Sequence, residues 1–250
     1  MLKEIRNLVA FLTIIPVGMD RDFLTDAAEY MPLFPMVGAL IGMLAGIFAW
    51  LLFQILPELI VGMLTLGLLL LITGLHHTDG LIDFGDGVMF HGSPEEKIEI
   101  MHDQKTGAGG LTLGLITLPT TALCISIVNA SIIIPSLIVS EVSAKLSMVV
   151  GAWMGKSAQK GMNTYFINAM HHKHRRTRLI FALTTALGIA LVSLWITGFV
   201  IMISGIITGL IIVGISNRHF RGITGDVLGA INDLTRMTSL ITLLAVIRWA

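Results

Sequence analysis

The sequence is short of charged residues and almost without cysteine. Asp, Glu, Lys and Arg make up 13% of its 250 residues, whereas soluble domains carry about 25%. The formal net charge is zero, which argues against a nucleic-acid-binding protein that works through a strongly basic surface. Cys124 is the only cysteine, which excludes an internal disulfide and a cysteine-cluster metal site. Because 54% of the residues are hydrophobic, the composition indicates a polytopic membrane protein.

Long apolar runs predict the membrane-spanning helices. An apolar helix of about 17 to 25 residues can cross a bilayer, and such runs lie at 33–56, 59–75, 109–128, 131–155, 179–196, 199–216 and 229–250. We therefore expect an all-α helical bundle of about six to seven transmembrane helices, forming one membrane domain over residues 1–250. Residues 3–15 carry an apolar face, which predicts an N-terminal amphipathic helix at the membrane interface or, alternatively, a short buried helix.

The spacing of the runs predicts the topology. Very short connections join them in pairs at 57–58, 129–130 and 197–198. If each run crosses once, the remaining polar segments all lie on one side of the membrane. These are the N-terminal segment 1–32, the Asp-rich segment 76–108, the basic loop 156–178 and the Gly/Asp loop 217–228. All but three of the 16 Lys and Arg residues fall in these segments, so we expect them in the cytoplasm, below a plasma membrane that the chain crosses several times.

The last apolar run is open to a second interpretation. Asn232, Asp233 and Arg236 lie near its start. They could belong to a cytoplasmic helix that precedes a shorter membrane span.

The segment HHTDGLIDFGDG at 76–87 carries the strongest chemical signal. Asp79, Asp83 and Asp86 are spaced so that a helix continuing out of the second apolar run would present them within about 60° of one another. Three such carboxylates repel one another unless a cation or strong donors hold them, and oxygen ligands of this kind suit Mg²⁺ or Mn²⁺. A solvated acidic helix end is the simpler alternative. We expect His77 to act as a hydrogen-bond donor beside the site, because the carboxylates need no histidine as a metal ligand.

Two further segments on the same side add candidates. In MHDQKTGAGG, residues 101–110, Asp103 could fold back as a fourth carboxylate. The glycines that follow could present backbone N–H groups to an anion at a helix N-terminus, although such turns also occur merely to begin helices. In GITGDVLGA, residues 222–230, Asp226 again stands beside glycine. A plain loop remains the alternative for this last segment.

Basic residues near and within the spans are candidates for substrate contacts. Glu141 and Lys145 are four residues apart in the fourth run, where they form either a structural ion pair or a pair that reaches into a substrate cavity. Lys156 and Lys160 lie close enough to a span end to meet a diphosphate. The remaining basic residues of 156–178 are typical of anchoring to anionic lipid.

Together these motifs resemble those of the cobalamin synthase family, the adenosylcobinamide-GDP ribazoletransferases. FLTIIPV at 11–17 is similar to the family's N-terminal signature, and 73–87 matches its pattern His-x-Asp-Gly-x-x-Asp-x-x-Asp-Gly. The Met-x-Asp…Gly-x-x-Gly element corresponds to Asp103, Gly107 and Gly110, and the Thr-Gly-Asp motif to Thr224, Gly225 and Asp226. The chain departs from the family at Arg236, where an acidic residue is expected and the nearby Asp233 is a possible substitute, and at Lys145, where the family tends to have Arg.

The resemblance implies a reaction and a set of site residues. α-Ribazole, or its 5′-phosphate, would attack adenosylcobinamide-GDP and release GMP with the help of Mg²⁺. Catalytic residues would be His77 and four carboxylates, which would also hold the metal: Asp79, Asp83, Asp86 and Asp103. Substrate contacts would come from Lys105, Gly107, Lys145, Lys156, Arg221, Thr224 and Asp226. The partners expected are these substrates and the lipid bilayer, without nucleic acid; an oligomer is left open.

Two other functions fit parts of the pattern. A CDP-alcohol phosphotransferase also uses a membrane-embedded aspartate row around a metal, but Ile82, Asp83 and Phe84 disagree with its Asp-Gly-x-x-Ala-Arg string. A divalent-cation transporter would distribute its acids through the spans. Here Glu141 is the one carboxylate deep inside a run.

Overall fold

The regular structure of this protein is helical throughout the part that the computed structural model describes, residues 2–18 and 23–249. This confirms the predicted all-α fold. The elements in chain order are α1 (Leu2–Leu12), α2 (Phe23–Glu29), the short 3₁₀ helix η1 (Met31–Leu33), α3 (Phe34–Leu52), α4 (Glu58–Ile72), α5 (His76–Met89), α6 (Pro94–Met101), α7 (Ala108–Ile127), α8 (Ile133–Met154), α9 (Met162–His171), α10 (Arg175–Phe220) and α11 (Gly225–Trp249).

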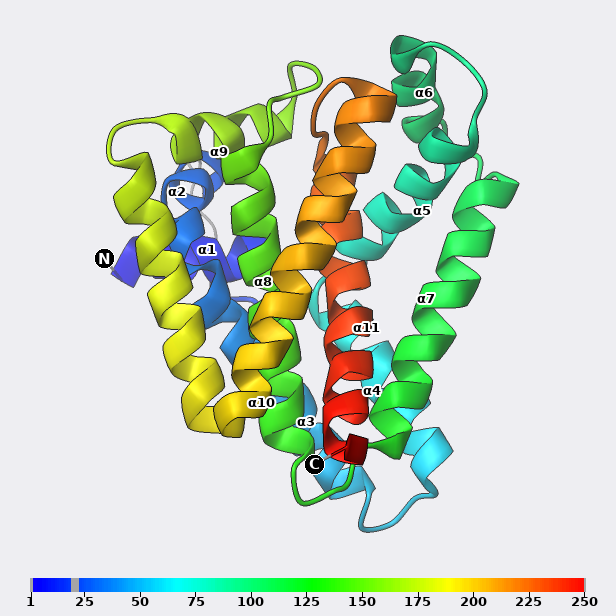
Figure 1. The fold of residues 1–250 in the computed structure, drawn as a ribbon, viewed down its shortest axis with the longest axis vertical. Helices are drawn as coiled ribbons and strands as arrows, with labels where there is room; N and C mark the ends of the chain where they lie inside the picture. Colours follow the sequence, from blue (N-terminus) through cyan, green and yellow to red (C-terminus); the bar gives the residue numbers. More distant parts are fainter. Residues whose placement is uncertain (1, 19–22, 250) are drawn as a thin grey trace.

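Five helices in the described residues are long and apolar enough to cross a membrane, or up to six if the bent pair α4–α5 is one span. α10 contains a break at Leu194 and Trp195, whose backbone angles are not helical. Figure 1 shows that the chain folds back at this break, so that α10 forms two antiparallel arms. These arms correspond to the two runs predicted at 179–196 and 199–216, and the structure confirms a multi-pass membrane protein.

α8 lies at the centre of the bundle, where it packs against α3, α10 and α11. The contact with α3 depends on glycines spaced four residues apart. A side chain at Gly38 would come within 2.6 Å of the Glu141 carbonyl oxygen, and one at Gly46 within 2.7 Å of Ile134 Cα. Small residues at this spacing let two helix backbones touch, which replaces the hydrophobic driving force that is missing in lipid.

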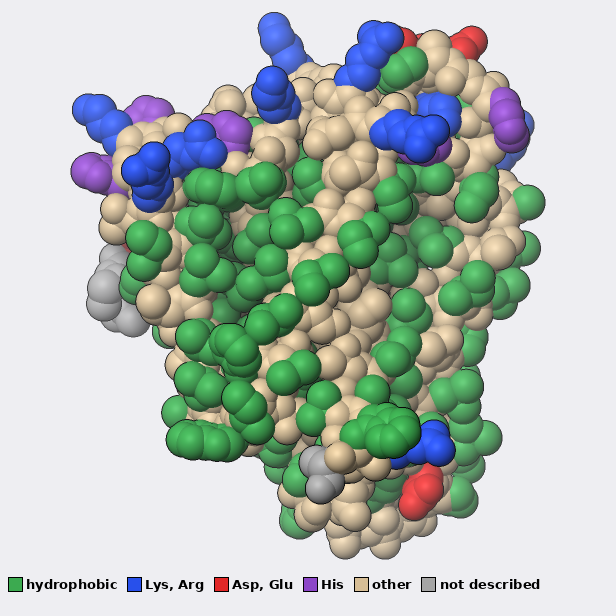
Figure 2. Space-filling view, viewed as in Figure 1, with side chains coloured by type: hydrophobic (Ala, Val, Ile, Leu, Met, Phe, Trp, Pro, Cys, Tyr) green, Lys and Arg blue, Asp and Glu red, His purple; other side chains and the backbone are tan. Residues whose placement is uncertain are grey.

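The polar segments gather at one end of the bundle, as the run spacing predicted. Figure 2 shows Lys, Arg and His side chains concentrated at the end where α6 and α9 lie in Figure 1, above a broad hydrophobic band. α1 lies across the bundle below this end and buries Leu8 and Leu12. Its Phe11 ring packs at a tilt against that of Phe166 in α9, with 5.0 Å between the ring centroids.

Three details differ from the sequence-based expectation. The basic loop 156–178 contains a helix, α9, because the Thr164 hydroxyl accepts from the Gly161 N–H and closes its first turn. The Gly/Asp loop 217–228 shrinks to residues 221–224, since α10 continues to Phe220 and α11 begins at Gly225. α11 is one continuous helix, so Asn232, Asp233 and Arg236 do not form a separate cytoplasmic helix.

Candidate active site

The aspartate row lies on a helix that turns sharply away from the preceding span. α4 and α5 meet at an angle of 95°. Gly74 and Leu75, which join them, both have φ of 63°, a left-handed conformation that ends α4. The sequence therefore predicted the helix correctly but not its direction: α5 does not continue out of α4. It lies toward the polar end of the molecule, between α11 and α7 and below α6 in this view (Figure 1).

A third carboxylate, that of Asp226 on α11, lies near Asp79 and Asp83 on α5. Asp79 is exposed and Asp83 half-buried. Burial raises the pKa of Asp83 to about 7, and neighbouring carboxylates add to the shift, namely Asp79, Asp226 and Asp86. α11 approaches so closely because a side chain at Gly80 would come within 2.8 Å of Asp226 Cα. The structure thus brings Asp226, predicted as a substrate contact, beside two residues of the predicted metal set.

Asp86, the third member of the row, has a different environment. Its Oδ2 accepts a hydrogen bond of 2.7 Å from the Gly107 N–H, and its Oδ1 one of 2.8 Å from the Gly110 N–H. These are the free amides at the N-terminus of α7, where a carboxylate is also favoured by the helix dipole. The Gly-rich turn therefore binds an anion, as its sequence suggested, and that anion is the carboxylate of Asp86.

A pocket beside Asp86 is lined by several residues that the sequence predicted as site residues. Its volume is about 380 Å³, and its lining includes Asp86, Asp103, Lys105 and Gly107. Asp103 Oδ1 accepts from the Lys105 N–H at 3.3 Å in the turn between α6 and α7. Asp103 therefore lies near Asp86, at one end of the aspartate row, and Lys105 lines the same pocket.

The Thr-Gly-Asp motif forms the start of α11. The Thr224 hydroxyl donates to Asp226 Oδ2 at 3.1 Å and accepts from the Val227 N–H at 3.3 Å. The turn before it is held by the Ile223 N–H, which donates to the Lys156 carbonyl at 2.7 Å. Thr224 therefore orients Asp226, and the Lys156 backbone supports the turn while its side chain is exposed.

A buried cluster of charges lies between α8 and α11. Lys145 Nζ lies 3.7 Å from Glu141 Oε2, which is the structural ion pair considered from the sequence. Arg236 extends it by donating to Glu141 and, at 2.7 Å, to Asp233 Oδ1. All four side chains are at most 2% exposed. Because the cluster contains two acids and two bases, its formal charge is zero. Arg236, which replaces an expected acidic residue, serves as a partner for both acids.

The buried cluster is connected to α5. Thr78, the residue before Asp79, donates a hydrogen bond of 2.7 Å from its hydroxyl to Asp233 Oδ2. The neighbouring His77 is buried, and its Nδ1 has no hydrogen-bond partner. A side chain at Gly229 would come within 2.9 Å of the His77 carbonyl oxygen, so α11 and α5 are in backbone contact. The cluster therefore fixes the helix that carries the aspartates.

The remaining candidates lie near the surface, and one residue was missed. Arg221 makes an ion pair of 3.0 Å with Glu95, and both side chains are largely exposed. His102 was not singled out from the sequence. It lies near Asp226, and its Nε2 is 3.3 Å from the Gln159 side-chain nitrogen. Its position next to Asp103 was the only available signal.

The donor set suits a hard cation only in part. Among the described residues, no three His, Cys, Asp or Glu side chains converge as a complete metal site. Mg²⁺, however, commonly binds through one or two carboxylates, with water and substrate phosphates as its other ligands. Asp79 and Asp83 fit that role, so Mg²⁺ stays a prediction that this geometry accommodates.

The fold and the site together define a multi-pass helical membrane protein with an acidic site at its polar end. The chain belongs to the cobalamin-5-phosphate synthase family, whose pattern it matches over residues 4–244. Membership in this family makes the protein an enzyme, a transferase of cobalamin synthesis.

Relatives are similar over nearly their whole length. A protein of Methanococcoides burtonii called adenosylcobinamide-GDP ribazoletransferase is 34% identical, over 97% of this chain and 92% of its own. A protein with the same name from Methanocella arvoryzae is 36% identical, over 96% of this chain and 94% of its own. Another from Thermococcus kodakarensis is 31% identical, over 98% of this chain and 99% of its own. No solved structure matches the chain.

Proposed function

We propose that this protein transfers the adenosylcobinamide phosphate group of adenosylcobinamide-GDP to α-ribazole or its 5′-phosphate, with release of GMP. The observation that supports this most directly is the group of uncompensated carboxylates at the polar end, formed by Asp79, Asp83 and Asp226. Such a group is unfavourable alone and becomes favourable beside cations that accompany a diphosphate. The names of the relatives provide the substrates.

The proposed step is a displacement at phosphorus. The α-ribazole hydroxyl oxygen forms a bond to the phosphorus nearest cobinamide, and the phosphoanhydride bond to GMP breaks as the hydroxyl loses its proton. Asp79 and Asp83 lie on successive turns of α5 and would orient the diphosphate through a bound cation. Mg²⁺ held there would neutralise charge that develops on the phosphate oxygens.

The pocket at the other end of the row would contribute a positive side chain. Lys105 lines it together with Asp86 and Asp103. Asp86 is already satisfied by two backbone N–H groups, so its role is to order the start of α7. Lys105 would then contact a phosphate oxygen. Gly107 keeps the start of α7 close to Asp86, because a side chain at this position would collide with the Asp86 carboxylate.

The proposed orientation places this site in the cytoplasm, at the inner face of the plasma membrane. The Lys, Arg and His side chains concentrated at this end agree with the distribution seen in cytoplasmic loops (Figure 2). The diphosphate of adenosylcobinamide-GDP is charged, so this substrate would reach the site from solution.

A turnover assay in a non-ionic detergent tests this function. Purified full-length protein is given adenosylcobinamide-GDP and α-ribazole, and GMP release is measured with Mg²⁺ and with EDTA. We expect release that requires both α-ribazole and Mg²⁺, and no CMP release from CDP-alcohols. Release without α-ribazole, or equal release in EDTA, would contradict the proposed reaction or its metal respectively.

A further inference from the structure

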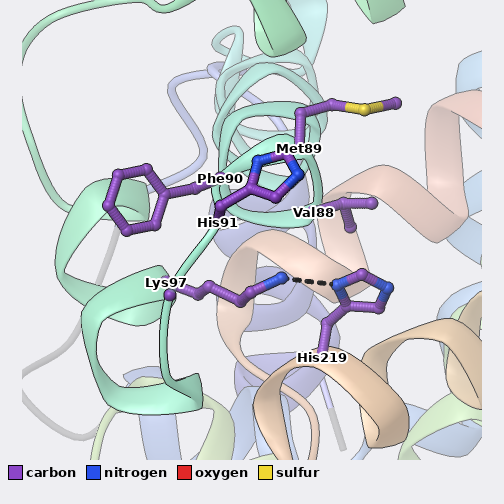
Figure 3. Close-up of a pocket in the computed structure, with 7 residues that line it drawn as sticks. Val88, Met89, Phe90, His91, Lys97 and His219 are labelled. Carbon is purple, nitrogen blue, oxygen red and sulfur yellow. Dashed lines mark hydrogen bonds between the residues drawn. The ribbon is translucent and has the colours of Figure 1, made fainter.

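A second pocket lies near the aspartate row and is unused in the proposed reaction. Its volume is about 430 Å³. It forms where the end of α5, the helix α6 and the last turn of α10 meet, and Met89 and Phe90 line both this pocket and the one beside Asp86. Figure 3 shows Lys97 of α6 reaching toward His219 of α10, with Phe90 and His91 above them in this view.

The Lys97 side chain is unusual because it is buried beside another basic residue. Lys97 is only 9% exposed, and its Nζ lies 2.8 Å from His219 Nδ1. An ammonium group has three donors and no acceptor, so His219 must accept through Nδ1 as a neutral ring. The His219 proton is then on Nε2, and two N–H groups of Lys97 stay available to another partner.

No acid neutralises Lys97 within the described part of the chain. The pocket is lined by Val88, Met89, Phe90, His91, Gly92, Lys97 and His219, which include no carboxylate. Nearby acids are engaged elsewhere, since Glu95 pairs with Arg221 and Glu96 accepts from the Ser93 N–H. A buried ammonium group with only a neutral partner is costly, and an anion in the pocket would relieve that cost.

The elements that hold these side chains are firmly placed. Ser93 and Glu96 close the start of α6 with a reciprocal pair of hydrogen bonds, one turn before Lys97. At the end of α10, the Phe220 ring packs edge-on against Phe84 of α5, with 6.0 Å between centroids. Lys97 and His219 are therefore held by the fold, and little ordering would be needed when a ligand binds.

We propose that this pocket binds a phosphate group, with Lys97 as the charged donor and His219 and His91 as further hydrogen-bond donors. The apolar side chains of Val88, Met89 and Phe90 would contact the organic part of the ligand. Lysine binds phosphate oxygens well as a compact point charge. The phosphate could belong to a soluble molecule or to a lipid head group, because the pocket lies at the polar end of a membrane protein.

The test measures binding by the full-length protein, without cobinamide substrate and without turnover. Inorganic phosphate and pyrophosphate are titrated in non-ionic detergent without divalent cations, and phosphatidic acid is compared with phosphatidylcholine in nanodiscs. We expect Lys97→Met to weaken binding about 10-fold or more. The exposed Lys173 provides the control, and Lys173→Met should change binding less than about twofold.

A measurement on the unaltered protein keeps the test valid if Lys97→Met does not fold. Amine-reactive acetylation of each lysine is followed by mass spectrometry, and a bound phosphate should slow the modification of Lys97 but not that of Lys173. Protection by phosphate or pyrophosphate identifies a soluble ligand, and protection by phosphatidic acid alone identifies a lipid head group. Protection by none of the three overturns the proposal, while the transferase reaction would be unaffected.

Discussion

Two groups of charges that are linked through α5 differ in their electrostatics. The buried cluster of Glu141, Lys145, Asp233 and Arg236 is neutral, and its acids and bases contact one another. The group of Asp79, Asp83 and Asp226 carries one sign of charge and is partly open to solvent. Thr78 connects them, since it precedes Asp79 and donates to Asp233.

The difference indicates what each group does. Charges that are fully paired in a membrane protein need nothing from outside, so the buried cluster is a structural element that fixes α5 against α11. Like charges held together without a counterion are stabilised by a cation or a cationic group, which is why we assign the three carboxylates to the proposed binding site. The following variants test this division, beginning with the largest expected effect.

Arg236→Met should destabilise the fold most. It leaves Glu141 and Asp233 with only Lys145 to balance them in a buried environment, and breaking such a pair costs about 3–5 kcal/mol. Thermal unfolding in detergent measures the loss. The double variant Glu141→Met/Arg236→Met leaves the cluster neutral, so it should be more stable than Arg236→Met alone; equal or lower stability would contradict a role based on charge balance.

Asp83→Asn should have the opposite profile, with activity lost and stability kept. Loss of one group that positions charge at a phosphoryl-transfer site lowers the rate roughly 100-fold or more. Removing one of three like charges does not weaken the fold, so the unfolding temperature should stay equal or rise. GMP release and thermal unfolding are measured on the same sample, with Glu58→Gln as a control at an exposed carboxylate outside the site. Near-normal turnover would remove Asp83 from the site.

Asp86→Ala sharpens the comparison, because this aspartate belongs to the row in sequence but caps a helix in the fold. Losing a carboxylate that accepts from two N-terminal amides costs about 0.5–2 kcal/mol. Hydrogen exchange at Gly107 and Gly110 should accelerate before any change elsewhere. If exchange there were unchanged while turnover was lost, Asp86 would belong with the binding carboxylates instead.

Arg221→Gln should have the smallest effect on stability. Its ion pair with Glu95 joins side chains that are 72% and 67% exposed, and such surface pairs contribute about 0–1 kcal/mol. A raised KM for adenosylcobinamide-GDP at unchanged stability would support the predicted phosphate contact. Unchanged KM and unchanged stability would mean that Arg221 makes no contact with the substrate. Glutamine is chosen because it keeps much of the length of the arginine side chain without its charge.

The aspartate row shows how far local periodicity carries a prediction. Its spacing correctly predicted a helix, but a helical projection treats Asp79, Asp83 and Asp86 as equivalent. They differ because Asp86 meets the amides of Gly107 and Gly110, more than twenty residues further along the chain. The pairing of Thr78 with Asp233 spans 155 residues. No spacing rule predicts such contacts, because they depend on how helices pack.

Composition and apolar run length by themselves determined that this is a helical multi-pass membrane protein, because backbone groups in lipid must be satisfied within a helix. The positions of short connections determined that the polar segments share one end, and the ordered motifs identified the family. Only the tertiary structure decided the direction of α5, the separation of Asp86 from Asp79 and Asp83, and the place of Asp226 beside them. Asp226 lies there because Gly80, which has no side chain, lets the backbones of α5 and α11 touch, and such contacts are made between elements far apart in the chain.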